Sequence, residues 1–262
     1  MKQIINISLW IIALVLIIVG LSFANKNKLY MQLSKPVIDI DYNSENRFID
    51  ETDVLKEIIH NPQDTSKYLY AFDVTTIEER LKNNFAIKDA QVYKTVDGKI
   101  VAWVKQNRPI ARVINHKNES FYMDEDGYLM SLSEKYTARL LVINGNVKSS
   151  YNQYYKKNLS QLDDSLATKT IIDELYQLAQ LIDNSEFWKA QIEQVYVNKE
   201  LEIELIPKVG NHIIVLGKPE HMEAKLNKLY YFYREGLSKT GWNEYSEINL
   251  SFNNQIVCKK NY

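Results

Sequence analysis

Apolar residues fill one continuous segment near the start of the chain, ahead of a longer part in which apolar and polar positions alternate. From Ile4 to Phe23 no side chain is ionisable. A helix of about 20 residues, at about 1.5 Å per residue, matches a hydrocarbon core of about 30 Å. The segment predicts one transmembrane helix at residues 4–24, between a tail at residues 1–3 and a linker at residues 25–36. The side chains that we assign as membrane anchors are Trp10, Leu14 and Ile18.

A cleaved secretory signal is the alternative interpretation of this segment. Ser22-Phe23-Ala24 offers small residues at a spacing that a signal peptidase accepts. A cleavable apolar region, however, usually covers about 7 to 15 residues behind a basic leader, and here only Lys2 precedes a longer one. These features favour an uncleaved anchor. Its orientation stays open, because the positive-inside rule would keep the main body in the cytoplasm on account of the lysines that follow: Lys26, Lys28 and Lys35.

The pattern after the linker predicts a small domain of mixed secondary structure. Val37–Tyr42 alternates between apolar and polar residues, as a strand does. Two amphipathic helices follow: Asp50 is a suitable N-cap for the first, and Thr75 with Glu78 has the spacing of a capping box for the second. A β-hairpin then turns at Asp97-Gly98. The order strand, helix, helix, strand, strand predicts a three-stranded sheet with two helices on one face.

A proline marks the boundary between this first domain, residues 37–107, and a second at residues 108–262. Pro109 has no N–H to donate to a sheet, so we place the boundary beside it. The predicted elements of the second domain are strands at 111–114, 120–123, 128–132, 140–143, 194–197, 201–206, 212–216, 248–252 and 255–258, helices at 167–181 and 220–235, the second ended by Gly236, and a loop at 151–164. The fold class is therefore α+β, with a β-rich second domain of antiparallel sheet and flanking helices.

Charge and cysteine content exclude several classes of partner and site. The formal net charge is -1, and lysines are interleaved with carboxylates, so the basic surface expected of a nucleic-acid-binding protein is absent. The single cysteine, Cys258, excludes an intrachain disulfide and a metal site built on paired thiolates. Periplasm and cytosol both remain allowed by this composition, and nucleic acid is not expected as a partner.

Motifs for catalysis or cofactor binding are absent from the sequence. Asp124-x-Asp126-Gly127 resembles the start of a calcium loop, but the glutamate that such a loop needs at its end is out of register, which favours a hairpin turn. The four histidines lie on separate predicted elements. No phosphate loop, dinucleotide-binding glycines or nucleophile elbow occurs. We expect no enzyme activity, no cofactor and no small-molecule substrate, and instead a protein that binds other proteins.

The last residues predict a strand at the edge of a sheet. Gln255–Cys258 would leave unpaired N–H and C=O groups there, and a strand from a partner could satisfy them. An edge that Lys259 and Lys260 protect from pairing is an equally weighted alternative. The residues that we predict to contact the partner are Leu250, Phe252, Asn254, Gln255, Ile256, Val257 and Cys258.

Several short motifs behind a single span resemble the FtsQ/DivIB family of bacterial division proteins. They are Phe85-Ala86-Ile87-Lys88-Asp89-Ala90-Gln91-Val92, Arg108-Pro109-Ile110-Ala111 and Phe121-Tyr122-Met123-Asp124-Glu125-Asp126-Gly127. The resemblance covers nearly the whole chain and depends on the order and spacing of these motifs. It implies that the first domain is a POTRA-like βααββ module. The family closes with a strand written roughly Asp-Leu-Arg-Tyr, where this chain has Asn249-Leu250-Ser251-Phe252, so a partner contact through that arginine is not carried over.

The resemblance also implies a location and a role. It implies a single-pass inner-membrane protein at the division septum, with the tail at residues 1–3 in the cytoplasm and the main body in the periplasm. Such a protein is a non-enzymatic scaffold of the divisome that binds FtsB- and FtsL-type partners through its final strands and helps to recruit or regulate septal wall synthesis. Two other classes stay open: a membrane-anchored POTRA-type chaperone or translocation module for extended polypeptides, and an anchored wall hydrolase whose site the sequence does not reveal.

Overall fold

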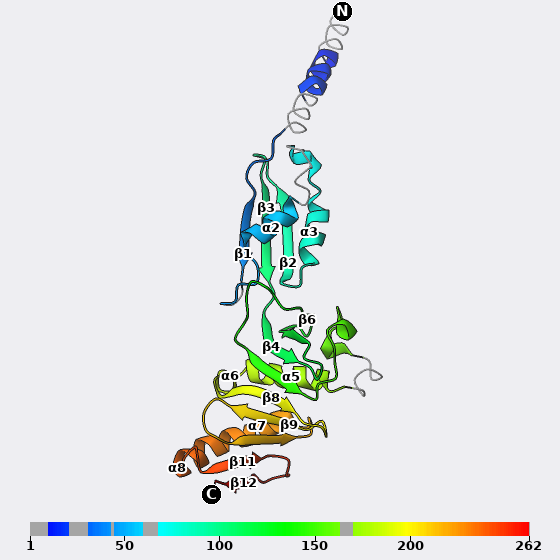
Figure 1. The fold of residues 1–262 in the computed structure, drawn as a ribbon. Coiled ribbons are helices and arrows are strands. Elements are labelled where there is room, and N and C mark those ends of the chain that lie inside the picture. The colour runs from blue at the N-terminus through cyan, green and yellow to red at the C-terminus, as the bar shows by residue number, and fades with distance from the viewer. Residues whose placement is uncertain (1–9, 21–30, 43–44, 60–67, 163–169, 262) are drawn as a thin grey trace, which may run out of the picture. The chain divides into compact units, whose positions relative to one another are not determined.

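The computed structural model describes residues 10–20, 31–42, 45–59, 68–162 and 170–261. The chain forms two compact units that divide between Asn107 and Arg108 (Figure 1). We call them the first unit and the second unit.

Residues 10–20 are helical, and their apolar side chains are exposed. The three predicted anchor residues are among them, with Trp10 78%, Leu14 60% and Ile18 55% exposed. In the described part of the chain, no helix has both the length and the hydropathy that a membrane crossing requires. Much of the predicted span, residues 4–9 and 21–24, lies outside the described residues, so the transmembrane helix stays a prediction.

The described part of the first unit contains a three-stranded sheet with β3 at its centre. β1 (Val37–Asp41) lies parallel to β3 (Ile100–Gln106), and β2 (Ile87–Lys94) lies antiparallel to β3 on its other side. The elements that connect β1 to β2 are α2 (Glu51–Ile58), the 3-10 turn η1 (Leu69–Ala71) and α3 (Val74–Lys82). The predicted order of strand, helix, helix, strand, strand is confirmed.

Carboxylates set where the two helices of the first unit begin. The Asp50 side chain accepts hydrogen bonds from the N–H groups of Thr52 and Asp53, so the predicted N-cap of α2 is confirmed. The predicted capping box of α3 is wrong, because Asp73, not Thr75, is the N-cap and accepts from the Thr75 N–H at 3.1 Å. Glu78, which the box would have used, turns instead to the sheet and accepts from the Val92 N–H at 2.6 Å.

In the second unit, the described strands form one nine-stranded sheet in the order β12-β11-β10-β9-β8-β7-β4-β5-β6 (Figure 1). Their bounds are β4 (Pro109–Ile114), β5 (Ser120–Asp124), β6 (Leu129–Met130), β7 (Leu141–Gly145), β8 (Ile192–Val197), β9 (Ile203–Pro207), β10 (Ile213–Gly217), β11 (Tyr245–Asn249) and β12 (Val257–Lys260). The prediction of an antiparallel sheet is wrong in part, because β4, β7 and β8 are mutually parallel and β10 is parallel to β11. Helical crossovers lie between β7 and β8 and between β10 and β11, and a crossover makes neighbouring strands parallel.

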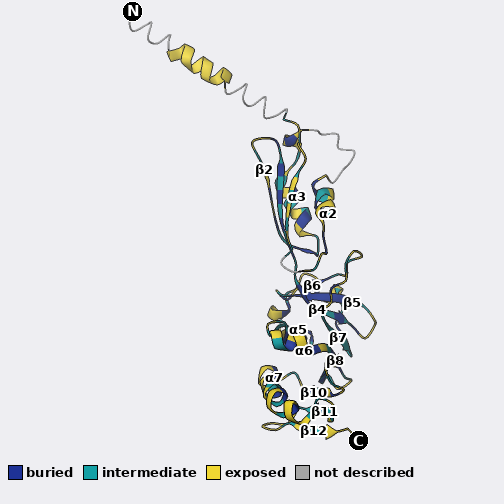
Figure 2. Ribbon diagram, turned by 90° about the vertical axis from the view of Figure 1, so that its left-hand side faces the viewer, coloured by how far each residue is buried: buried dark blue, intermediate teal, exposed yellow. Residues whose placement is uncertain are grey.

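Helices cover one face of this sheet (Figure 2). They are α5 (Ile172–Asp183), α6 (Glu186–Gln191), α7 (Met222–Tyr231), a π-helical continuation at Phe232–Leu237, and α8 (Ser238–Thr240). One row of paired residues runs across the sheet under them: Phe121, Val113, Ile143, Val195, Leu205, Ile214, Ile248 and Cys258. All members of the row except Cys258 are fully buried, so this row is the floor of the hydrophobic core.

The two predicted helices of the second unit have different bounds in the structure. The first begins at Ile172 instead of residue 167, and residues 163–169 lie outside the described residues. The second does not end at Gly236, because the helix continues through it as a π-helical turn and ends at Gly241, where φ is +105°. Gly236 has no positive φ, and glycine ends a helix most readily where the backbone turns left-handed.

Three short helical segments of the second unit escaped the sequence prediction. The predicted loop at residues 151–164 contains the 3-10 turns Asn152–Tyr154 and Leu159–Gln161, which bury Tyr154 and Leu159 in the core. The helix α6 was not predicted at all, although Ser185 caps it by accepting from the Trp188 N–H at 3.3 Å. Segments this short carry too few turns to show a helical period.

Candidate docking edge

β12 lies at one edge of the sheet in the second unit. Among the described strands its one neighbour is β11, which it joins in antiparallel register, with Ile248 opposite Cys258 and Asn249 opposite Val257. One long side of β12 therefore faces away from the sheet. Backbone N–H and C=O groups on such a side can pair with a strand from another chain.

The predicted strands at 248–252 and 255–258 are displaced in the structure. β11 ends at Asn249 and β12 begins at Val257, so the residues between them form the turn. Asn254 adopts a φ of +59° in this turn, a left-handed conformation that asparagine tolerates better than most residues. The sequence pattern misplaced the strands because the turn itself contains apolar residues.

An ammonium group on α7 fixes this turn. Lys228 Nζ donates to the carbonyl oxygen of Phe252 at 2.9 Å and to that of Gln255 at 3.1 Å. The Ser251 N–H donates to Asn249 Oδ1 at 2.9 Å and closes the start of the same turn. Lys228 therefore ties the turn to α7 and sets where β12 begins.

The predicted contact residues fall into a buried set and an exposed set. Leu250 is 1% exposed, and its N–H donates to the Val215 carbonyl at 2.8 Å, so its side chain belongs to the core. Ile256 and Cys258 are half-buried against the same core, and burial raises the pKa of the Cys258 thiol. The exposed members are Phe252, Asn254, Gln255 and Val257. The exposed set offers apolar side chains and amide groups to a partner, whereas the buried set holds the strand in place.

Charges at this edge are basic. Lys259 and Lys260 are exposed, and β12 contains no carboxylate. Glu247 lies opposite Lys259 on β11, and the Ser246 hydroxyl donates to the Lys259 carbonyl at 3.3 Å. A strand added to β12 would therefore meet cations, which favours a partner segment that carries carboxylates.

Candidate metal ligands do not cluster in the described residues, where no group of three or more His, Cys, Asp or Glu side chains is placed to hold an ion. His116 Nδ1 lies 3.0 Å from the Val147 carbonyl oxygen, and His212 Nε2 lies 2.8 Å from Tyr233 Oη. His60 lies outside the described residues. Of the three described histidines, His116 and His212 therefore make separate structural contacts, and His221 lies at the start of α7.

The acidic segment that resembled a calcium loop is a turn between β5 and β6. Asp124 Oδ1 accepts from the N–H groups of Asp126 and Tyr128 at 3.0 and 2.8 Å. Gly127 has a φ of +88°, and a Cβ there would lie 3.1 Å from the Tyr176 ring. The hairpin interpretation of this segment is confirmed.

Two family models match the sequence. One, described as FtsQ/DivIB, C-terminal related, matches residues 108–259, which is more than half of the chain. The chain belongs to this FtsQ/DivIB-related family. A model of a POTRA-like domain matches residues 34–105, and no curated protein matches the sequence. Both matches confirm the resemblance, and the FtsQ/DivIB-related match connects the protein with bacterial cell division.

In this FtsQ/DivIB-related chain, the motif that begins at Arg108 organises the second unit. Arg108 Nε donates to Glu125 Oε2 at 2.7 Å, and its Nη1 donates to Asp183 Oδ2 at 2.8 Å. The Glu125 N–H donates back to the Arg108 carbonyl at 3.0 Å. Arg108 thereby joins the start of β4, the β5–β6 turn and the end of α5. Pro109 is the first residue of β4, a position where a missing N–H is tolerated.

Lys228 is the functional candidate that sequence reasoning missed. It lies 24 positions before Phe252 in the chain, and only the fold brings its ammonium to the β11–β12 turn. In the sequence, a helical lysine that binds a distant turn has the same pattern as a helical lysine that contacts only solvent. The sequence of this FtsQ/DivIB-related protein therefore contains no signal that distinguishes it.

Proposed function

We propose that this protein is a non-enzymatic scaffold of the divisome that binds FtsB- and FtsL-type partners by strand addition at β12. In this proposal residues 4–24 anchor it in the inner membrane, the main body lies in the periplasm, and the protein helps to recruit or regulate septal wall synthesis. The domain bounds of the proposal are 37–107 for the POTRA-like domain and 108–262 for the C-terminal domain.

The observation that carries the proposal is the position of β12 at the edge of its sheet. It has a described neighbour on one side only, and a turn held by Lys228 leads into it. A strand whose position is fixed before binding loses little conformational entropy when a partner pairs with it. Family membership supports the choice of partner class, because it connects the chain with division proteins.

Binding of the full chain in lipid nanodiscs to FtsB- and FtsL-type proteins of the same organism tests the proposal. We expect saturable binding that a proline at Ile256 reduces by at least about a hundredfold, because proline removes a backbone donor and distorts the edge. Circular dichroism and a thermal melt of the same samples report whether the fold is kept. Absence of binding by folded wild-type protein would contradict the proposal.

A polypeptide-binding module is the second candidate, and a groove in the first unit favours it. The groove has a volume of about 470 Å³, lies beside β2 and includes the exposed rings of Tyr70 and Tyr93. Against it, the Val92 N–H of β2 is already donated to Glu78. Comparable binding of many unrelated extended peptides would support this candidate, and selective binding of the division partners would exclude it.

A further inference from the structure

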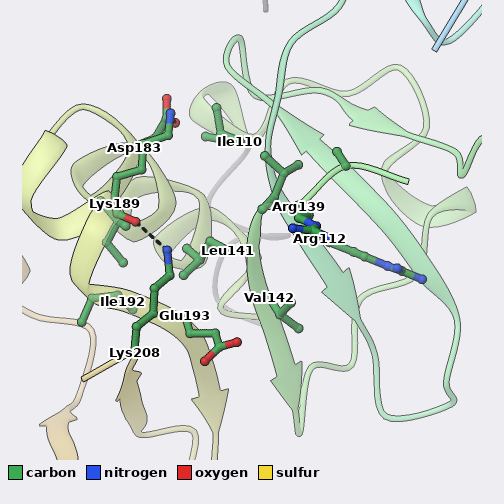
Figure 3. A pocket seen from close by; sticks show the side chains of 13 residues that line it. Ile110, Arg112, Arg139, Leu141, Val142, Asp183, Lys189, Ile192, Glu193 and Lys208 are labelled. Carbon is green, nitrogen blue, oxygen red and sulfur yellow. Dashed lines mark hydrogen bonds and ion pairs between the residues drawn. The ribbon is translucent and has the colours of Figure 1, made fainter. Parts of the chain in front are cut away.

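A second pocket in the second unit lies away from β12, at the beginning of three parallel strands. Its volume is about 530 Å³ (Figure 3). Each of the strands β4, β7 and β8 contributes residues from its first half. Residues at the end of α5 and directly after β9 complete the wall. The lining includes the apolar Ile110, Val142 and Ile192 and the basic Arg112, Arg139 and Lys208.

The floor of this pocket is an open margin of the hydrophobic core. Ile110, Ile182 and Ile192 are 2–3% exposed and belong to the core cluster. Leu141 and Val142 are half-buried beside them. A large apolar side chain that entered the pocket would extend the packing of this core. Its burial is favourable because it removes apolar surface from water.

The rim of the pocket carries cations that no carboxylate neutralises. Among the described residues, Arg112, Arg139 and Lys208 have no carboxylate within ion-pair distance; Arg112 Nε donates to Ser120 Oγ at 2.9 Å, and Lys208 Nζ donates to the Lys189 carbonyl at 3.0 Å. Asp183 is already engaged by Lys189 and Arg108 at 2.6 and 2.8 Å. Glu193 is the one other acid in the lining. The rim therefore has an excess of positive charge.

The placement of these cations decides the kind of ligand. Figure 3 shows Lys208 on one side of the pocket and Arg139 on the other, whereas the Arg112 side chain extends away toward β5. Cations on opposite sides of an apolar floor suit an extended chain with carboxylates at intervals better than one compact anion. We propose that this pocket docks an acidic segment of a protein partner, with one large apolar side chain on the isoleucine floor and carboxylates at Arg139 and Lys208. This site is independent of strand addition at β12.

Fluorescence anisotropy of the full chain with three labelled peptides tests the proposal. The first peptide is a glycine-serine chain with one phenylalanine flanked by glutamates; the second replaces the glutamates by lysines, and the third replaces the phenylalanine by alanine. We expect the first peptide to bind at least tenfold more tightly than either control, because charge and apolar contact are both required. Equal binding of the lysine peptide would overturn the proposal.

Variants place the binding in the pocket. Arg139→Glu and Val142→Trp should each weaken binding of the first peptide by about tenfold, the first by reversing a charge and the second by filling the floor. Lys199→Glu, an equal charge reversal in the exposed turn at the other end of β8, should leave binding unchanged. Cys258→Pro should also leave it unchanged, which separates this site from β12. If Arg139→Glu bound the first peptide as tightly as wild type does, or if inorganic phosphate displaced the peptide, the proposal would be overturned.

Discussion

Each unit has a sheet with an edge strand, β2 in the first unit and β12 in the second. The two edge strands differ in the side chains that lie along their backbone donors. At β2, the Val92 N–H donates to Glu78 Oε1 at 2.6 Å and the Ala90 N–H donates to Asp89 Oδ1 at 2.9 Å. Lys82 in turn forms an ion pair with Asp89 at 2.9 Å. At β12, the last two residues of the strand are the exposed Lys259 and Lys260, and α7 holds the turn that leads into the strand.

This difference separates two ways to manage an exposed edge. A carboxylate that accepts from an edge amide occupies the donor that an incoming strand would need, so β2 is closed by its own side chains. Lysine side chains discourage pairing by charge but leave the backbone donors in place, so an acidic strand can still pair. The comparison therefore predicts that strand addition is selective for β12.

Proline substitutions in β12 and β2 should give the largest difference in affinity for the FtsB-type partner. Cys258→Pro should reduce affinity for the FtsB-type partner by about a hundredfold or more, because proline removes a donor on the outer side of β12 and fixes φ. Lys94→Pro, at the exposed end of β2, should leave that affinity unchanged. Surface plasmon resonance on the full chain measures both, and Cys258→Ala controls for the loss of the side chain. Equal effects of the two prolines would remove the distinction between the edges.

Removal of Glu78 should open the β2 edge. Glu78→Ala leaves the Val92 amide without its acceptor, and Val92 is 5% exposed, so we expect a loss of about 1–3 kcal/mol in the unfolding free energy of the first unit. Amide exchange at Val92 should accelerate. The exposed neighbour Glu79→Ala is the matched control and should have little effect. Unchanged exchange at Val92 would show that Glu78 does not close this edge.

Release of the β11–β12 turn should weaken docking moderately. Lys228→Met removes the ammonium that binds two turn carbonyls, so we expect affinity for the partner to fall about threefold to tenfold, with a faster dissociation rate. Lys225→Met is the matched control, because Lys225 Nζ donates to the Lys218 carbonyl from the same helix. If both variants bind alike, the turn does not depend on Lys228.

Acid should weaken the second unit through His212. Burial lowers the pKa of this imidazole below its ordinary value of 6.5, so the unfolded state binds more protons below that pH. Its contribution to stability is complete above pH 6.5 and is lost as the pH falls toward the folded pKa. Burial also raises the pKa of Glu174 to about 7, which shifts stability in the opposite direction, so the comparison must be made between variants.

The comparison uses thermal melts of wild type and His212→Gln at about pH 7.5 and about pH 5.5. We expect wild type to lose about 2–4 °C more than the variant on acidification, which corresponds to about 1 kcal/mol. An equal loss in both proteins would show that His212 does not titrate in this range.

Local patterns predicted much of the fold. The strands and helices of the first unit follow from alternation, helical spacing and the Asp50 cap, all of which act within a few residues. The meander of β8, β9 and β10 was likewise visible as alternation between turns. Sheet direction in the second unit was not, since it depends on which strands the crossovers bring together, a property of long-range packing.

The candidate site was predictable only in part. The position of the last strand near the end of the chain suggested an edge, but Leu250 shares the apolar character of Val257 and is buried, whereas Val257 is 43% exposed. Burial of this kind is decided by the register of β11 against β10 and not by residue type. Lys228 and Glu78 act on segments far from them in the chain, and their patterns match those of ordinary surface residues.

Hydrogen–deuterium exchange of the full chain, with and without the FtsB-type partner, tests the selective use of β12 most directly. We expect amides of Val257–Lys260 to become protected when the partner is added, while amides of Ile87–Lys94 keep their exchange rates. Protection at β2 with no change at β12 would contradict it.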